Sequence, residues 1–310
     1  MIFDLNMKIN NYSLVNTIKK HSDSITSLIL LKDKRIASSS EDYTIKIFNP
    51  ENDFHCDITI NNKTEFFSIC QLDNGLIASL LSSHNIALWS IVDCSYQFVA
   101  QFNLLQQSEI GENDSSYSIG KIVSLSGISF AICTEAPEII IWKDYETKKI
   151  LKASNEDVIS ILFIKERNVL ISGGYDSKVR IWNMTSFQCV SLIDGAFCIE
   201  ANSLTRLDDN KIGVGGDRCY AIINIDKCII EDKISMEDID SINCSIKLND
   251  GNILCGCFDG DATISSIKER NSSVNYLKIH NKCITDFLKI NEKTFVSCSK
   301  DGSIKVWKEI

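Results

Sequence analysis

Short runs in which apolar and polar residues alternate extend along almost the whole chain. One such run is VISILFI at 158–164, and turn sequences such as DNG at 73–75 and NDG at 249–251 separate the runs. A period of two places alternate side chains on opposite faces of a strand, and Asn, Asp and Gly are the residues that tight turns favour. We find no segment with the period of an amphipathic helix. The pattern therefore predicts an all-β protein of short antiparallel strands.

A repeated unit organises these strands. The segments 36–48, 170–182 and 295–307 each contain a strand of small residues, a turn led by Asp, and an alternating strand that ends in an aromatic residue. Weaker copies complete a set of seven turn anchors, which are Asp42, Ser83, Ala136, Asp176, Asp217, Asp259 and Asp301. Successive anchors lie 40 to 42 residues apart, except for the 53 residues from Ser83 to Ala136, where we expect an insertion at about 106–118. A repeat of about 40 to 45 residues is typical of a four-stranded propeller blade, so the sequence predicts a seven-bladed β-propeller.

The repeat resembles the WD40 family from about Tyr12 to Ile310. A blade of that family links a His before its first strand, a Ser or Thr in its second, the turn Asp, and a Trp in its third. The seventh repeat has His280, Ser297, Asp301 and Trp307 at these places, the first has His21, Ser38 and Asp42 with Phe48 in place of Trp, and the fourth has Ser172, Asp176 and Trp182 with Asn155 near the His position. The resemblance implies a buried structural relay from carboxylate through imidazole and hydroxyl to indole. The second, third, fifth and sixth blades lack it, so we expect apolar packing alone to hold them.

The two ends of the chain are expected to close the ring. The chain stops at Ile310, just after the third strand of the last blade, and residues 12–20 read as a strand before the first His. This N-terminal strand can complete the last blade, which hides two sheet edges that would otherwise invite aggregation. Residues 12–310 then form one propeller, and residues 1–11 are either a tail or an extra edge segment.

Composition is that of a globular protein inside the cell. The 310 residues are 44% hydrophobic and 24% charged, the first twenty contain no apolar block of a secretory signal, and no stretch approaches the roughly 20 apolar residues of a membrane span. The 13 cysteines are odd in number and irregularly spaced, which indicates reduced thiols. The net charge of −9, with Lys and Arg scattered, disfavours nucleic acid as a partner. We expect a cytoplasmic protein, with the nucleus as the alternative, that binds neither nucleic acid nor membrane.

No set of residues supports catalysis, a cofactor or a metal. Two of the four histidines, His21 and His280, belong to the relay, and no serine lies in a G-x-S-x-G motif. The turns at 73–75 and 259–261 lack the downstream Glu and the ligand spacing of a calcium loop. Cys255 and Cys257 share one strand face, but the sequence brings no further zinc ligands near them. We therefore expect a protein that is not an enzyme.

The rim that carries the turn anchors is the expected docking surface, together with the loops that enter each first strand. Aromatic side chains on such turns are costly to leave in water and are enriched at binding hot spots. The candidate apolar residues are Tyr175, Phe197 and Phe258, and the charged ones are Glu41, Glu156, Asp157, Asp238 and Lys300. The excess of acids favours a basic, partly extended peptide. Alternatively, the acids only keep the protein soluble and the aromatics fold inward. The 106–118 insertion is either a binding arm or a flexible excursion.

A scaffold or adaptor that is monomeric by itself and holds partner proteins together in a larger complex is the preferred function. One alternative is the substrate receptor of a ubiquitin ligase. Against it, no Trp-Asp-x-Arg sequence follows any of the four tryptophans, and an acidic rim does not suit phosphorylated peptides, which need clustered Arg. A reader of histone-like or methyl-lysine peptides is the other alternative, and it would require an aromatic cage at the centre of the ring.

Overall fold

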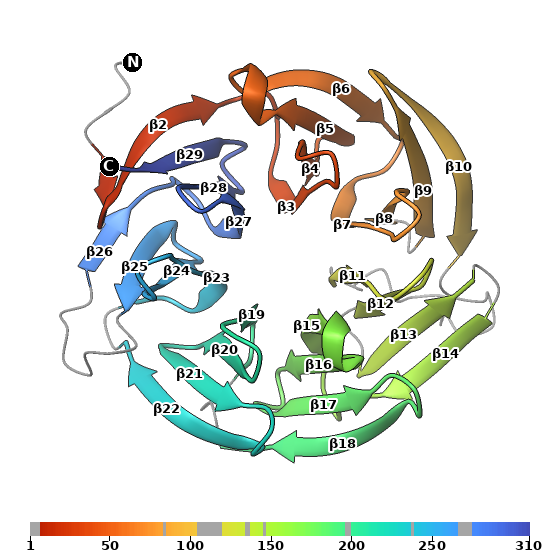
Figure 1. Cartoon of the computed structure of the whole chain (residues 1–310), viewed down its shortest axis with the longest axis vertical. Coiled ribbons are helices and arrows are strands. Elements are labelled where there is room, and N and C mark those ends of the chain that lie inside the picture. The colour runs from red at the N-terminus through yellow and green to blue at the C-terminus, as the bar shows by residue number, and fades with distance from the viewer. Residues whose placement is uncertain are drawn as a thin grey trace, which may run out of the picture.

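Seven antiparallel sheets stand around a common axis in the computed structural model (Figure 1). It describes residues 7–82, 85–103, 120–133, 137–144, 147–195, 200–236, 239–265 and 275–310. The described residues form strands and two short 3-10 turns, at Pro50–Asn52 and Lys165–Arg167, and no α-helix. The prediction of an all-β, seven-bladed propeller is therefore confirmed.

We number the blades 1 to 7, and blades 1 to 6 each have four strands in chain order from the axis outward. Blade 1 contains β3 (Ile25–Leu30), β4 (Ile36–Ser40), β5 (Thr44–Asn49) and β6 (His55–Asn61), and blade 2 contains β7 (Phe66–Gln71), β8 (Ile77–Leu81), β9 (Asn85–Val92) and β10 (Ser95–Asn103). Blade 3 contains β11 (Ile122–Ser124), β12 (Phe130–Cys133), β13 (Glu138–Lys143) and β14 (Thr147–Lys152), and blade 4 contains β15 (Val158–Ile164), β16 (Val169–Gly174), β17 (Val179–Asn183) and β18 (Gln188–Ile193). Blade 5 contains β19 (Ser203–Arg206), β20 (Lys211–Gly216), β21 (Cys219–Asn224) and β22 (Ile229–Ser235), and blade 6 contains β23 (Ile242–Lys247), β24 (Ile253–Cys257), β25 (Asp261–Ser265) and β26 (Asn275–Lys278).

Blade 7 joins the two ends of the chain. It contains β27 (Ile284–Asn291), β28 (Thr294–Ser299) and β29 (Ile304–Glu309), and its fourth strand is β2 (Tyr12–Ile18), which pairs antiparallel with β29. A short fifth strand, β1 (Lys8–Ile9), pairs with the outer edge of β2. Closure of the ring by the N-terminal strand is confirmed, and β1 is an edge segment that covers the strand beneath it.

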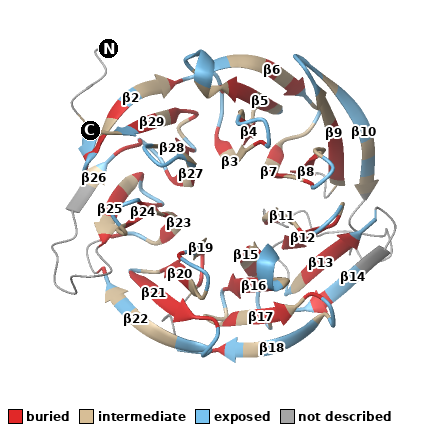
Figure 2. Ribbon diagram, in the orientation of Figure 1, coloured by how far each residue is buried: buried red, intermediate tan, exposed pale blue. Residues whose placement is uncertain are grey.

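Apolar packing between neighbouring blades forms the core. Strand β4 is buried along its whole length, as are β8, β21 and β24. Outer strands such as β18 and β22 are largely open to solvent (Figure 2). Both faces of an inner strand must be covered in a stack of sheets, which is why short runs such as 77–81 are apolar without strict alternation.

Side chains also link the innermost strands of neighbouring blades. Six of the seven joints between blades have a hydrogen bond of this kind. In chain order, these bonds run from Thr26 Oγ1 to the Phe66 carbonyl, from the Ile122 N–H to Ser68 Oγ, from Ser160 Oγ to the Ala201 carbonyl, from Thr205 Oγ1 to the Ser245 carbonyl, from Asn243 Nδ2 to the Ile284 carbonyl, and from Thr285 Oγ1 to the Ile25 carbonyl. Among the described residues, the joint between blades 3 and 4 has no bond of this kind. That joint depends on apolar contacts.

Candidate functional site

The two ends of the propeller differ in which turns they carry. Because neighbouring strands are antiparallel, the turns between second and third strands lie on the same side as the loops that enter each first strand. We call this side the anchor rim. The opposite rim carries the turns between first and second strands and between third and fourth strands.

A four-residue relay lies beneath the anchor rim in blade 7. His280 Nδ1 lies 3.2 Å from Asp301 Oδ2, and His280 Nε2 lies 2.8 Å from Ser297 Oγ. The Trp307 indole N–H donates to Ser297 Oγ at 3.0 Å. Since Nδ1 faces a carboxylate, it carries the imidazole proton, and Nε2 accepts from the serine hydroxyl. The relay thus ties the loop, the turn and the second and third strands of the blade together.

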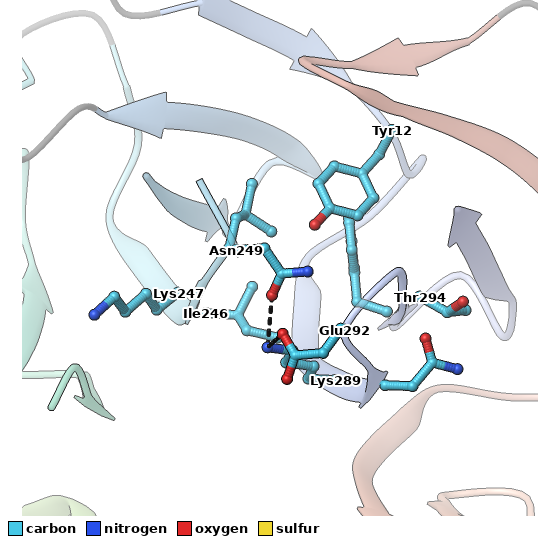
Figure 3. A pocket seen from close by; sticks show the side chains of 10 residues that line it. Tyr12, Ile246, Lys247, Asn249, Lys289, Glu292 and Thr294 are labelled. Atoms are coloured by element: carbon cyan, nitrogen blue, oxygen red, sulfur yellow. Dashed lines mark hydrogen bonds and ion pairs between the residues drawn. The ribbon is translucent and has the colours of Figure 1, made fainter. Parts of the chain in front are cut away.

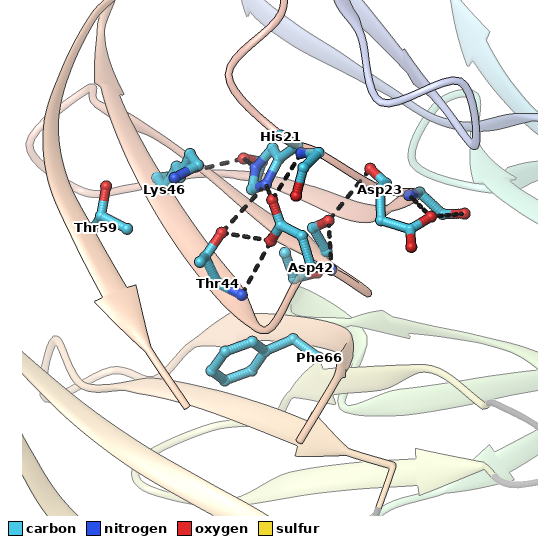
Figure 4. Close-up of polar contacts among 12 residues, drawn as sticks. His21, Asp23, Asp42, Thr44, Lys46, Thr59 and Phe66 are labelled. Atoms are coloured by element: carbon cyan, nitrogen blue, oxygen red, sulfur yellow. Dashed lines mark hydrogen bonds and ion pairs between the residues drawn. The ribbon is translucent and has the colours of Figure 1, made fainter. Parts of the chain in front are cut away.

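Blade 1 has the same arrangement without the indole (Figure 4). His21 Nδ1 lies 2.8 Å from Asp42 Oδ2, and His21 Nε2 lies 2.7 Å from Ser38 Oγ. Thr44 adds a hydroxyl that donates to Asp42 Oδ1 at 2.5 Å. Phe48 replaces the Trp of the repeat and is buried. The hydroxyl of Ser38 therefore receives no indole N–H here.

Burial and hydrogen bonding set the charge states of these relays. Burial lowers the pKa of both His21 and His280, although the neighbouring carboxylates oppose the shift. Burial raises the pKa of Asp42 and of Asp301, but the hydrogen bonds from the histidines and from the hydroxyls outweigh it and hold both pKa values well below their usual range. A neutral imidazole against an ionised carboxylate is therefore the resting state of each relay.

The order Ser, His, Asp is also that of a nucleophilic triad. A nucleophile must reach its substrate, but the side chains of Ser38 and Ser297 are fully buried. Their hydroxyls are also occupied by the bonds of the relay. This burial favours a structural role for both relays.

Half relays occur in two further blades. In blade 4, Trp182 donates to Ser172 Oγ at 3.0 Å, and Asp176 pairs with Arg180 at 2.6 Å. We expected Asn155 near the His position, but it is exposed, and the neighbouring Ser154 contacts Asp176 instead.

Blade 2 corrects a second expectation. Apolar packing was predicted to hold it alone, but Trp89 donates to Ser79 Oγ at 2.9 Å. The sequence contains the signal, because this serine lies ten residues before its Trp, as in blades 4 and 7. In blade 3 the corresponding residue is Ile132, and the buried Trp142 Nε1 has no hydrogen-bond partner.

Backbone hydrogen bonds hold the residues before the anchors at equivalent places on the anchor rim. In five blades the N–H of this residue donates to a carbonyl of the entry loop, from Glu41 to Ser24, Ser82 to Glu65, Tyr175 to Asp157, Phe258 to Ser241 and Lys300 to Cys283, over 3.0 to 3.2 Å. The backbone of these residues is therefore held in place, which limits where their side chains can lie. Such pre-organisation lowers the entropy lost on binding a partner.

The aromatic residues predicted for this rim lie partly in solvent. Tyr175 and Phe258 are each 41% exposed, and Glu41 and Asp157 are half-buried while Glu156 and Lys300 are exposed. Phe197, Asp238 and the 106–118 insertion lie outside the described residues.

Tyr43 is a third exposed aromatic residue of the anchor rim, and sequence reasoning missed it. It is 49% exposed and follows the anchor Asp42 with φ +66°. The residue after the anchor has a positive φ in other blades too, where it is Ser177, Arg218, Gly260 or Gly302. Such a position favours Gly or Asn over a bulky residue. A bulky tyrosine directly after a turn anchor was therefore the sequence signal that could have identified Tyr43.

Carboxylates surround Phe258. Asp240 and Asp259 are exposed, and Asp261 lies on the first position of β25. Burial and the neighbouring Asp259 raise the pKa of Asp261, which indicates a locally negative field. Lys278 partly offsets it, since its ammonium lies 3.6 Å from Asp261 Oδ1.

Other kinds of site find little support in the part of the chain that the structure describes. Its twelve cysteines are free thiols, and no group of three or more His, Cys, Asp or Glu is placed to hold a metal ion. Within the described ranges, no helix is long and apolar enough to cross a membrane.

Fold and relays together define a seven-bladed β-propeller in which a histidine relay stabilises each of two blades, blade 1 and blade 7. Three segments, 12–49, 145–183 and 271–308, match the family model for the WD domain, G-beta repeat. These three segments are thus WD40-type repeats, and the resemblance predicted from the sequence is confirmed for them. The crystal structure of the WD40 β-propeller domain of Doa1 superimposes with a TM-score of 0.76 over 97% of this chain and 98% of that domain, at 15% identity.

Curated relatives match parts of the chain. Striatin-3 of Rattus norvegicus is 25% identical over 59% of this chain and 24% of its own length, and the WD repeat-containing protein 55 homolog of Dictyostelium discoideum is 25% identical over 52% of this chain and 40% of its own length. The nuclear distribution protein nudF 1 of Talaromyces marneffei is 36% identical over 23% of this chain and 16% of its own length. The matched region therefore spans less than half of each relative.

Proposed function

We propose that this protein is a non-catalytic adaptor that docks a basic, extended segment of a partner protein on its anchor rim. The observation that carries the proposal is the set of exposed aromatic residues Tyr43, Tyr175 and Phe258, which emerge from equivalent turns among carboxylates. Large aromatic side chains that are partly exposed in the free protein contribute strongly to binding when a partner covers them.

The spacing of these aromatics favours an extended ligand. They belong to blades 1, 4 and 6, so no two of them lie on neighbouring blades. A methyl-lysine cage needs several aromatic faces around one ammonium group. A ring of separate contacts suits a segment that crosses the rim better than it suits a single modified side chain, so the reader hypothesis is the weaker of the two.

Charge supports a basic segment over a phosphorylated one. The residues around the aromatics include Glu41, Glu156, Asp240 and Asp259, whereas phosphate recognition requires convergent Arg side chains. The same argument makes the ubiquitin-ligase receptor the weaker alternative. We propose an adaptor that works as a monomer within a larger complex, in the cytoplasm or alternatively the nucleus.

The test compares two triple variants in affinity purification and mass spectrometry from the native cell type. The first, Tyr43→Ala with Tyr175→Ala and Phe258→Ala, removes the aromatics of the anchor rim. The matched control, Val190→Ala with Leu192→Ala and Ile229→Ala, removes apolar side chains that are similarly exposed, by 59%, 52% and 47%, on outer strands. Both must melt like the wild type.

We expect a defined set of partners to vanish with the rim variant and to persist with the control. Because the attraction is partly electrostatic, the same partners should be released as salt is raised. Partners that persist with the rim variant would contradict docking on the anchor rim.

A further inference from the structure

A cavity of about 330 Å³ opens on the opposite rim between blades 3 and 4. Its walls include Leu125 from the first turn of blade 3, Ile141 and Lys143 from β13, and Met184 and Phe187 from the turn that leads into β18. Pockets that hold ligands have volumes of about 300 to 1,000 Å³ and are mainly apolar. This cavity is large enough to receive apolar side chains of another molecule.

Five of the other six blade joints are bridged on this rim. Polar bonds cross these five joints, from Lys32 Nζ to the Asp73 carbonyl at 2.6 Å, from the Gly127 N–H to Asp73 Oδ2 at 2.8 Å, from Arg206 Nη1 to Glu166 Oε2 at 2.9 Å, from Lys247 Nζ to the Leu207 carbonyl at 2.8 Å, and from Lys289 Nζ to Asn249 Oδ1 at 2.6 Å. Between blades 3 and 4, no hydrogen bond joins described residues on this rim. The joint between blades 7 and 1 also has no such bond among the described residues, and Lys165 of blade 4 pairs with Asp73 of blade 2 at 2.8 Å. The cavity therefore lies at one of two joints that no direct polar bond closes on this rim.

The joint between blades 6 and 7 shows how the same space is filled elsewhere (Figure 3). There only about 10 Å³ remains, because Tyr12 packs edge-on against Phe295 with 5.0 Å between ring centroids. Lys289 closes the recess through Asn249 and Glu292. A hollow of the larger size is therefore not a general feature of blade joints.

The chemistry of the cavity specifies the ligand. Leu125, Ile141 and Met184 form a buried apolar floor, and the flexible thioether of Met adapts to different shapes. Among the walls, Lys143 is exposed and forms no ion pair with a described residue. Beside them, Lys149 places its ammonium 4.4 Å from the centroid of the Phe187 ring. No acidic residue is among the described walls. A ligand with a large apolar side chain beside carboxylates complements this arrangement.

We propose that this cavity is a second docking site, which takes a short segment of a partner protein that carries large apolar side chains flanked by acidic residues. Its charge preference is opposite to that of the anchor rim, and it lies on the other end of the propeller. Two partners of opposite charge character could then bind at once. This site does not depend on the anchor rim, and separate variants test each.

The probe is a fluorescein-labelled synthetic peptide, Gly-Asp-Glu-Leu-Phe-Asp-Glu-Gly, titrated with the whole protein and followed by fluorescence anisotropy. Two control peptides replace either Leu-Phe by Ser-Ser or every acidic residue by Lys. We expect binding of the acidic apolar peptide alone, and we expect it to weaken as salt screens the lysines.

Phe187→Gly is the informative variant, because the relief of a positive φ offsets part of the packing that Phe187 gives to the core beneath it, and its melting temperature is measured alongside. Phe187 has φ +57°, a conformation that Gly adopts without strain. Cys228→Gly is the matched control, because Cys228 has φ +55° and ends an equivalent turn of blade 5, in which the leading Asn also caps two N–H groups. Lys143→Glu reverses the charge at the mouth.

Phe187→Gly and Lys143→Glu should each weaken the peptide at least about tenfold, whereas Cys228→Gly and the triple variant of the anchor rim should leave its affinity unchanged. Failure of the acidic apolar peptide to bind, equal binding of either control peptide, or unchanged affinity in both cavity variants would overturn the proposal. Sedimentation that shows a dimer of the protein alone, lost on Phe187→Gly, would assign the cavity to a second copy and overturn it as well.

Discussion

The unpaired indole of blade 3 leads to a test of what the Ser–Trp bonds contribute. Trp142 is buried with no partner for Nε1, whereas Trp182 donates to Ser172 Oγ in the next blade. Replacing either Trp by Phe removes a similar volume from a core between blades. One substitution removes a donor without a partner and the other breaks a hydrogen bond. Comparing the two variants therefore separates the contribution of the hydrogen bond from that of volume.

The magnitude follows from the two environments. Trp182→Phe loses a hydrogen bond of about 1 kcal/mol and leaves the buried Ser172 hydroxyl, which is 1% exposed, without its donor. Trp142→Phe instead removes a buried donor whose lack of a partner costs about 1 to 3 kcal/mol. We therefore expect Trp142→Phe to be less destabilising than Trp182→Phe by about 2 kcal/mol or more.

Thermal and urea unfolding followed by circular dichroism measure this difference. With about 2 to 4 °C per kcal/mol in larger domains, the two variants should melt roughly 4 °C or more apart, with the Trp142→Phe variant the more stable. Trp89→Phe should behave like Trp182→Phe, because Trp89 also donates to a buried serine. Equal losses in all three variants would refute the reasoning, since they would mean that only volume matters.

Three further predictions concern the ring as a whole. Burial lowers the pKa values of the His21 and His280 imidazoles, so the unfolded chain binds more protons than the folded protein below about pH 6.5. Stability should therefore fall on acidification from about pH 8 to pH 5.5. A melting temperature that rises over this range would contradict the prediction. Deleting the residues up to Ile18 removes the fourth strand of blade 7, and gel filtration should show aggregation instead of a monomer because the edge of the preceding strand is freed. Gly174→Ala would place a Cβ 2.2 Å from the Asp157 carbonyl oxygen, so it should lower the free energy of unfolding by about 1 to 3 kcal/mol, and an unchanged denaturant midpoint would count against this close contact.

The architecture was readable in the sequence because a propeller is built from local units. The clearest blades show alternation, a turn residue such as Asp301 and a closing aromatic such as Trp307, and all of these lie within one repeat. The repeat length then determined the number of blades. Closure by the N-terminal strand followed from the count of strands, because the last repeat is one strand short.

The candidate sites depend on contacts between repeats, and only the tertiary structure determines these contacts. That Tyr43 points into solvent from a left-handed turn and that Trp142 Nε1 finds no partner are matters of packing, which the order of residue types does not encode. The cavity beside Phe187 is the clearest case. It exists because side chains from two blades, far apart in the chain, do not together fill the space between them, and such a difference of volumes has no local pattern in the sequence.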